Sequence, residues 1–170
     1  MSIPKPKPTP GRPQTPCIGI CSTALGDEVC RGCKRFAEEV VRWNAYSGEE
    51  RFAVYKRLDN LLVQSVQIKF LITDAERLQQ KIRYQQIEYR FDQDPYCWLY
   101  DLLRQGAGQI KQLNDYGARV KPEWRQYTLV DLKEKIDGDY YERSVNYFRR
   151  YILPAESALK NSASVLSESV

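Results

Sequence analysis

Hydrophobic residues recur with the period of an α-helix along most of this sequence. Phe36, Val40 and Trp43 occupy positions i, i+4 and i+7, so they share one face of a short helix. Ser47 and Glu50 then form the S-x-x-E pattern of a capping box, which predicts that a second helix begins there. The apolar stripe of this second helix continues through Phe52, Tyr55, Leu58 and Leu62.

The segment 63–72 (VQSVQIKFLI) fits two different patterns. Its alternate residues from Val66 to Ile72 are apolar, as they are in a half-buried β-strand. A strand needs a partner, however, and no second strand-like segment stands out in the sequence. We therefore expect this segment to be helical.

Capping patterns also predict where the later helices begin. Thr73 with Glu76 forms another capping box, and Asp94 before Pro95 is a cap followed by proline at the first helical position. The helices that begin there are expected to end near residues 91 and 104, and further helical segments are expected at about 109–118, 129–136 and 139–153, the last halted before Pro154.

The final segment, 139–153, would present two faces. One is a predicted buried stripe of Tyr141, Val145, Phe148 and Ile152. Beside it lie tyrosines and arginines, which in other proteins stack on nucleic-acid bases or grip acidic protein surfaces. The same pattern is typical of an ordinary solvated helix edge, which is the interpretation we favour. These residues are Tyr140, Arg143, Tyr147, Arg150 and Tyr151.

Composition narrows the possible chemistry, because the 170-residue chain contains no histidine. A Ser-His-Asp or Cys-His catalytic site and any histidine metal ligand are therefore excluded. The glycine-rich loops that bind nucleotides are also missing, and no pair of carboxylates is marked for acid–base catalysis. The chain is therefore more consistent with a binding protein than with an enzyme.

Four of the five cysteines form a compact pattern, Cys17-x3-Cys21-x8-Cys30-x2-Cys33. Two short pairs of cysteines, each from one tight turn, can supply the four thiolates of a tetrahedral metal site. Each pair encloses a glycine, and the spacer contains Leu25-Gly26-Asp27, a turn that would return the second pair to the first. We predict one metal centre held by these four cysteines.

The spacing leaves the metal and its role open. Zinc fits four sulfur ligands, whereas an iron–sulfur cluster also takes four cysteines but normally with other spacings. Alternatively, Cys30 and Cys33 form a redox dithiol at the start of a helix, or the cysteines are simply buried thiols. Cys97, which lies among aromatic residues, is expected to be a core thiol.

The net charge of +4 lies in residues 1–35, since the rest of the chain is balanced. Residues 1–16 are rich in proline and basic, with no apolar stretch of a secretory signal. We expect a disordered arm there and reduced cysteines in the cytoplasm. The arm is a candidate for binding nucleic acid, although Arg31, Lys34 and Arg35 would partly neutralise the metal thiolates instead.

The four-cysteine segment also resembles a known family. The resemblance is carried by P-C-I-G-I-C-S at 16–22, C-R-G-C at 30–33, Glu38-Glu39, Trp43 and the turn S-G-E-E-R at 47–51. Residues from Pro16 to about Leu58, about a quarter of the chain, resemble the YdhL-like predicted iron–sulfur proteins, small bacterial domains of unknown function. The resemblance implies that the four cysteines are the site and implies no established reaction. Lys34 stands where the family usually has glycine.

These patterns together predict an all-α protein in four parts. We expect a disordered basic arm over residues 1–16, a four-cysteine metal-knuckle module with two short helices over 17–60, an α-helical domain over 61–160 and a disordered tail over 161–170. A module of this size usually needs a metal or a disulfide in order to fold. The metal would therefore be mainly structural.

The function expected from the sequence is that of a cytoplasmic metal-binding adaptor. Its cofactor would be Zn²⁺ or an iron–sulfur cluster on Cys17, Cys21, Cys30 and Cys33. Its partner would be a protein, or less readily a nucleic acid, and no segment is apolar enough for a membrane span. The alternative is an iron–sulfur electron-transfer protein that uses the same four cysteines.

Overall fold

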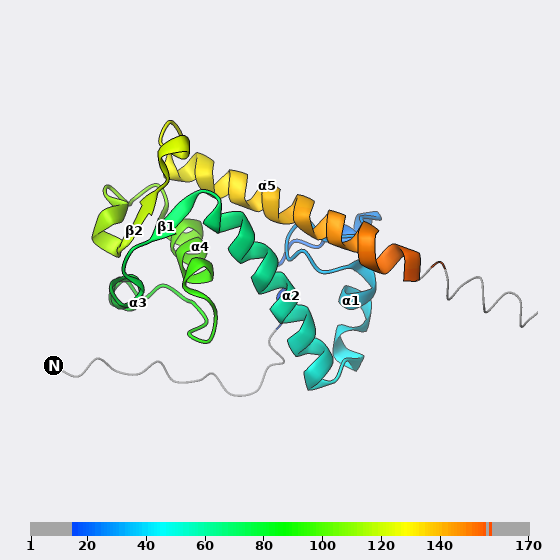
Figure 1. Ribbon diagram of the computed structural model, residues 1–170. Helices are drawn as coiled ribbons and strands as arrows, with labels where there is room; N and C mark the ends of the chain where they lie inside the picture. Colours follow the sequence, from blue (N-terminus) through cyan, green and yellow to red (C-terminus); the bar gives the residue numbers. More distant parts are fainter. Residues whose placement is uncertain (1–14, 156, 158–170) are drawn as a thin grey trace, which may run out of the picture.

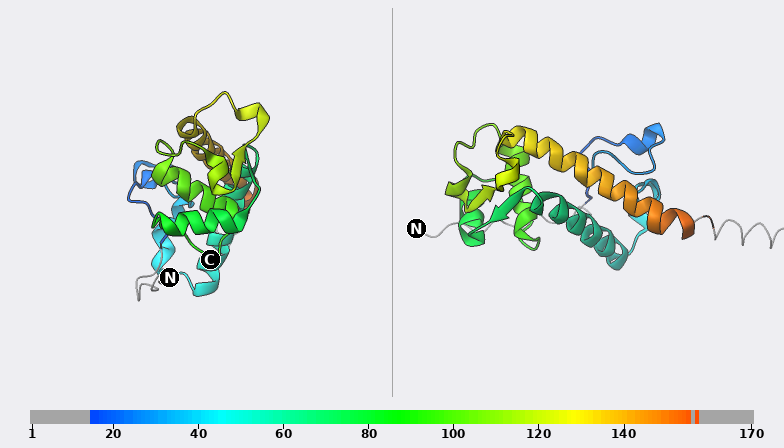
Figure 2. Two further views of the ribbon diagram at one scale, coloured as in Figure 1. Left: turned by 90° about the vertical axis from the view of Figure 1, so that its left-hand side faces the viewer. Right: turned by 45° about the horizontal axis from the view of Figure 1, so that its top comes forward.

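Two long helices, α2 (Gly48–Gln67) and α5 (Leu129–Tyr147), pack against each other near one end and diverge toward the other (Figure 1). The computed structural model describes residues 15–155 and 157. Helix α4 (Pro95–Gly106) packs against both long helices, and α3 (Ala75–Tyr84) packs against α4. The short helix α1 (Ala37–Arg42) and the cysteine-bearing residues before it lie alongside the C-terminal half of α5 (Figures 1 and 2).

The capping residues set where the helices begin. Ser47 accepts a hydrogen bond from the Glu50 N–H at 3.2 Å, and the Glu50 carboxylate accepts one from the Ser47 N–H at 2.7 Å, so the predicted capping box is confirmed. The Asp94-Pro95 start of α4 is also confirmed. At α3 the cap is Asp74, which accepts from the Arg77 N–H at 2.9 Å. The predicted box with Thr73 is wrong, and α3 ends at Tyr84 rather than near residue 91.

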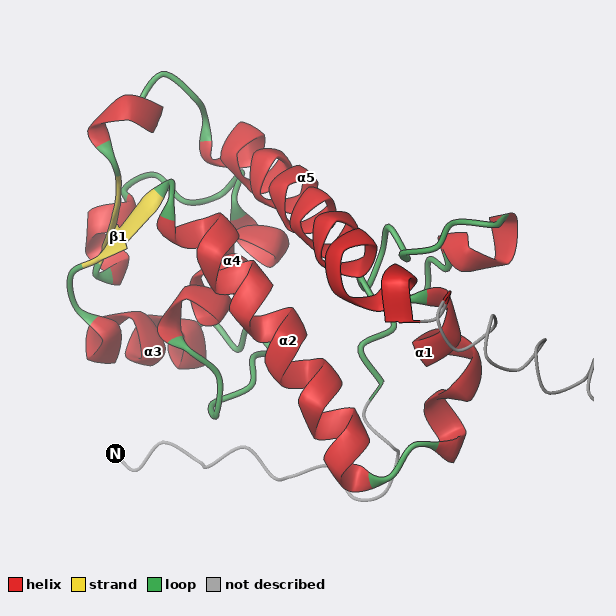
Figure 3. Ribbon diagram, turned by 45° about the vertical axis from the view of Figure 1, so that its right-hand side comes forward, coloured by secondary structure: helices red, strands yellow, loops and turns green. Residues whose placement is uncertain are grey.

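A small antiparallel sheet corrects the all-α prediction (Figure 3). Helix α2 ends at Gln67, and strand β1 (Phe70–Ile72) pairs with strand β2 (Ala118–Val120) in the register Phe70 to Val120. The prediction of helix is therefore right for 63–67 and wrong for 70–72. The partner strand lies at the end of the segment 109–118, whose only helical part is the 3₁₀ turn Leu113–Tyr116. The described residues are otherwise mainly helical, as predicted.

Helix α5 is one continuous helix and not the two predicted segments. It passes through Gly138 without a break and continues into a π-helical turn, Phe148–Ile152. The predicted stripe faces inward: Phe148 is buried, and the rest of the stripe packs against a small cluster that also contains Val29 and Phe36. Tyr140, which was expected on the adjoining face, is buried as well.

Most buried apolar side chains belong to one cluster formed by α2, α3, α4 and α5. Trp43 and Cys97 lie in this cluster, so both predictions of a core role are confirmed. The cluster of Val29, Phe36 and Phe148 is much smaller and joins the cysteine-bearing segment to the end of α5. None of the described helices is long and apolar enough to cross a membrane.

The turn before β2 depends on a glycine. Gly117 has a φ of +73°, and its carbonyl accepts hydrogen bonds from the N–H groups of Thr73 and Asp74 at 2.8 and 3.0 Å. A Cβ atom at this position would lie 2.3 Å from the Asp74 carbonyl oxygen. The short sheet and the start of α3 are therefore held together at one residue that has no side chain.

We expect Gly117→Ala to lower the free energy of unfolding by about 2 kcal/mol or more, because the left-handed backbone alone costs an alanine about 1–2 kcal/mol. Gly138→Ala is the matched control. It lies inside α5 with open space around its Cα, so the same change should raise the free energy of unfolding by about 0.5–1 kcal/mol. Urea denaturation measures both changes. Equal effects at the two positions would contradict this account of Gly117.

Candidate metal centre

The first cysteine pair lies on an exposed loop. Gly19, between Cys17 and Cys21, has a φ of +89°, a left-handed conformation that glycine adopts more readily than other residues. A single 3₁₀ turn, Ser22–Leu25, follows and is closed by Gly26 at a φ of +98°. The predicted turn around Gly26 is thus confirmed, and it returns the chain toward the second pair.

The second cysteine pair lies on a tight, buried turn. The Lys34 N–H donates to the Cys30 carbonyl at 2.8 Å, and the Cys30 N–H donates to the Arg35 carbonyl at 2.8 Å. Val29 and Phe36 form an antiparallel bridge on either side of this turn. Cys30 and Cys33 are both buried, whereas Cys17 and Cys21 are exposed.

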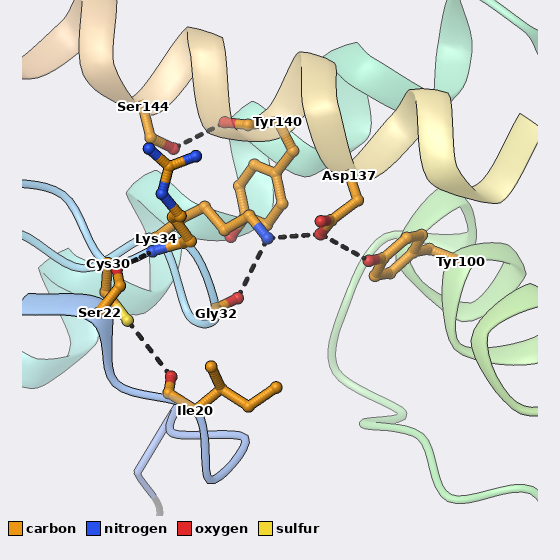
Figure 4. A network of polar contacts seen from close by, with 10 residues as sticks. Ile20, Ser22, Cys30, Gly32, Lys34, Tyr100, Asp137, Tyr140 and Ser144 are labelled. Carbon is orange, nitrogen blue, oxygen red and sulfur yellow. Dashed lines mark hydrogen bonds and ion pairs between the residues drawn. The ribbon is translucent and has the colours of Figure 1, made fainter. Parts of the chain in front are cut away.

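The two cysteine-bearing turns touch each other. The Arg31 N–H donates to the Ser22 hydroxyl oxygen at 2.8 Å, and the Cys30 Sγ lies 3.5 Å from the Ile20 carbonyl oxygen (Figure 4). A Cβ atom at Gly32 would lie only 2.4 Å from the same carbonyl oxygen. Glycine is therefore required at position 32 because another chain segment approaches it, and not because its φ is positive.

The thiol groups of the second pair differ in their tendency to ionise. Burial would raise the pKa of Cys30, but backbone N–H groups of Cys33, Ser22 and Gly32 and the Cys33 side chain together lower it to about 7 from 9.0. Burial raises the pKa of Cys33, against the opposing effect of Arg35, whose Nε donates to its sulfur at 3.3 Å. The turn therefore stabilises one thiolate more than the other.

The first pair makes fewer contacts. The Gly19 N–H lies 3.4 Å from the Cys17 Sγ, and the Cys21 Sγ lies 3.1 Å from the Thr23 hydroxyl oxygen. Within residues 15–155 and 157, no three cysteine or carboxylate side chains gather closely enough to hold one metal ion. The structure thus brings Cys30 and Cys33 together on one turn and places the other two cysteines on the loop that contacts it.

The chemistry of these donors fits a thiolate-bound metal. N–H groups point at the sulfurs of Cys17, Cys30 and Cys33, and such hydrogen bonds stabilise thiolate ligands. The four thiols come from two contacting turns, and four cysteine thiolates are one of the donor sets that structural zinc sites use. The four-ligand site itself stays a prediction.

The basic residues around the second cysteine pair form contacts that the sequence did not indicate. We expected Arg31, Lys34 and Arg35 to neutralise the thiolates, but only Arg35 contacts a sulfur. Arg31 pairs with Asp27, and Lys34 pairs with Asp137 on α5. The sequence marked Lys34 as a cation beside the cysteines and as a residue at a position where the resembling family has glycine.

Buried ionic contacts attach this segment to α2. The Glu39 carboxylate accepts from the Phe36 N–H at 2.9 Å, which caps α1, and also accepts two hydrogen bonds from Arg57. The Arg57 guanidinium also lies over the Phe36 ring, 3.9 Å from its centre. Glu39 is therefore both a capping residue of α1 and a buried carboxylate.

Comparison with known proteins finds one match. The family described as "Protein of unknown function (DUF1289)" matches residues 15–62, which include the four cysteines, α1 and most of α2. No curated protein and no solved structure gives a significant match. The match supports a small domain of unknown function over this part of the chain. It carries no iron–sulfur assignment, so that part of the resemblance stays a prediction.

We expect the metal-free, reduced protein to show a thiolate titration with a midpoint at about pH 7, well below the ordinary thiol value of 9.0, because backbone N–H groups stabilise the Cys30 thiolate. The ultraviolet absorbance of thiolate measures this titration. Cys30→Ser should remove the step, and Cys97→Ser should leave it, since Cys97 is a core thiol whose pKa is raised by burial. A first step in the ordinary thiol range would contradict the assignment.

Proposed function

We propose that this chain is a metal-binding adaptor in which Cys17, Cys21, Cys30 and Cys33 hold one metal centre of mainly structural purpose. The observation that carries the proposal is the direct contact between the two cysteine-bearing turns, through Ser22 with Arg31 and Ile20 with Gly32. Four thiols from two adjoining turns match the donor set of a structural zinc site. A metal ion bound by thiolates from both turns would link the two turns to each other.

The structural role is supported by how little apolar surface this segment buries on its own. Its buried residues Val29 and Phe36 complete their cluster only with Phe148 of the C-terminal π-helical turn. Segments with so small a core usually rely on a metal or a disulfide. We propose a cytoplasmic location, because a reducing compartment keeps the four cysteines from forming disulfides and leaves them available as metal ligands.

A protein partner is the better proposal for the adaptor role. The loop of the first pair exposes Ile18, Ile20 and Leu25, the last with 90% of its surface accessible. Apolar side chains gathered on one loop favour a protein surface, whereas nucleic acid is bound chiefly through free lysines and arginines. The nearby cations Arg31 and Lys34 are already paired with carboxylates.

Zinc is the proposed metal, and an iron–sulfur cluster is the alternative. Full-length protein purified without oxygen should be colourless and contain about one zinc per chain. A brown protein with acid-labile sulfide would instead support an iron–sulfur centre, as the resemblance to predicted iron–sulfur proteins implies, and would reopen the electron-transfer role.

Each of the four variants Cys17→Ser, Cys21→Ser, Cys30→Ser and Cys33→Ser should lose most of the bound metal, because a structural site needs all four ligands. Cys97→Ser is the control, since Cys97 is buried among α2 and α4 residues and should leave the metal content unchanged. Elemental analysis gives the metal content, and limited trypsin digestion reports the folding of residues 15–62. A wild-type protein free of zinc and iron would overturn the proposal.

A further inference from the structure

Lys34 closes the turn that carries Cys30 and Cys33. Its backbone has a φ of +61°, in the left-handed region where glycine is favoured, and its N–H donates to the Cys30 carbonyl at 2.8 Å. Its side-chain ammonium donates to the Gly32 carbonyl at 3.1 Å. A single residue therefore holds two carbonyl groups of the cysteine turn, one through its backbone and one through its side chain.

The ammonium of Lys34 is fixed by groups from the helical part of the chain. The side chain is only 2% exposed, and its Nζ pairs with the Asp137 carboxylate of α5 and lies 5.2 Å from the centre of the Tyr140 ring (Figure 4). Asp137 in turn accepts a hydrogen bond from the Tyr100 hydroxyl of α4 at 3.2 Å. A buried ammonium must be paired, so its position is determined by where α5 places that carboxylate.

We propose that Asp137 is a positioning residue for the thiol site, acting through Lys34 to hold the Cys30–Cys33 turn in its metal-binding geometry. The proposal rests on the metal site proposed above. Asp137 lies 103 residues from Lys34 in the sequence and touches no sulfur among its described contacts. Its effect passes through the Lys34 ammonium to the Gly32 carbonyl, which lies between the two cysteines.

The coupling works in both directions. If Asp137 raises the affinity of the turn for metal, then bound metal strengthens the contact between this turn and α5 by the same factor. Residues next to a metal's ligands that orient them typically change metal affinity by about 10- to 100-fold when they are removed. Metal binding would thus be felt in the helical part of the chain.

The first experiment compares Asp137→Asn with Asp139→Asn. Asp139 is two residues away on α5 and pairs with another buried lysine, Lys69, which contacts Ser65 and Trp124 and none of the four metal-site cysteines. Both variants remove one carboxylate charge from a buried lysine, so their effects on folding should be similar. Zinc affinity, measured by competition with a chromophoric chelator, should fall about 10- to 100-fold for Asp137→Asn and stay unchanged for Asp139→Asn.

Lys34→Gly tests whether the effect passes through lysine. Glycine keeps the left-handed turn but removes the ammonium, so zinc affinity should fall as in Asp137→Asn. The double variant Lys34→Gly with Asp137→Asn should be no weaker than Lys34→Gly alone. Circular dichroism at the assay temperature shows that each variant is folded.

The outcomes separate the two proposals. Wild-type protein that binds neither zinc nor iron overturns both. Wild-type protein that binds zinc, with Asp137→Asn equal to wild type or to Asp139→Asn, overturns only the positioning role. Independent losses that multiply in the double variant also overturn it, because Asp137 would then act by a route other than Lys34.

Discussion

The contact of the cysteine-bearing segment with α2 and α5 is the interaction on which its geometry depends. Phe36 lies at the centre of that contact, since its ring packs against Phe148 at 5.1 Å between centres and is covered by Arg57. The two sides of the cysteine turn bridge at Val29 and Phe36, so the residue that packs against Phe148 also forms one side of the turn. A site that looks local in the sequence is therefore built on two helices that follow it.

Three cations with little solvent exposure form ion pairs between segments of the fold. Lys34 pairs with Asp137 and Lys69 with Asp139, both on α5, and Arg57 of α2 pairs with Glu39 of α1. A buried ion pair contributes little net stability compared with well-packed apolar residues, because both charges must leave water. It does disfavour alternative placements, since a shift of the helix would leave a cation without its partner. We infer that these pairs set the register of α5 against the rest of the molecule.

The parts of the fold that were predicted correctly depend on short-range patterns. Ser47 with Glu50 and Asp94 with Pro95 cap their own helices, and each pattern is complete within four residues. The strands were missed because each has only three residues, and β1 finds its partner across a long stretch of chain. The sequence predicted separate helical segments at 129–136 and 139–153, but α5 continues through Gly138 and packs against α2 and α4.

For the site, the spacing predicts that Cys17, Cys21, Cys30 and Cys33 act as one group, and the residues around Gly26 predicted the turn that the structure shows there. It could not identify Lys34 as a connection to Asp137, since a lysine beside cysteines in sequence has no visible partner 103 residues away. Nor could it show that the Ile20 carbonyl oxygen leaves no room for a side chain at Gly32, because that constraint comes from another segment of backbone. Both the role of Lys34 and the need for glycine at position 32 depend on contacts with another segment of the chain.

Helix α2 runs through residue 62, where the match to the family ends, and continues to Gln67. The segment that the family matches therefore ends inside α2 and not at the end of a secondary-structure element. Separated from α5, it would lose the Phe148 side of its small core and the carboxylate of its buried lysine. The matched segment and the end of the α5 helix therefore share one small core, so a change in either one alters the packing of both.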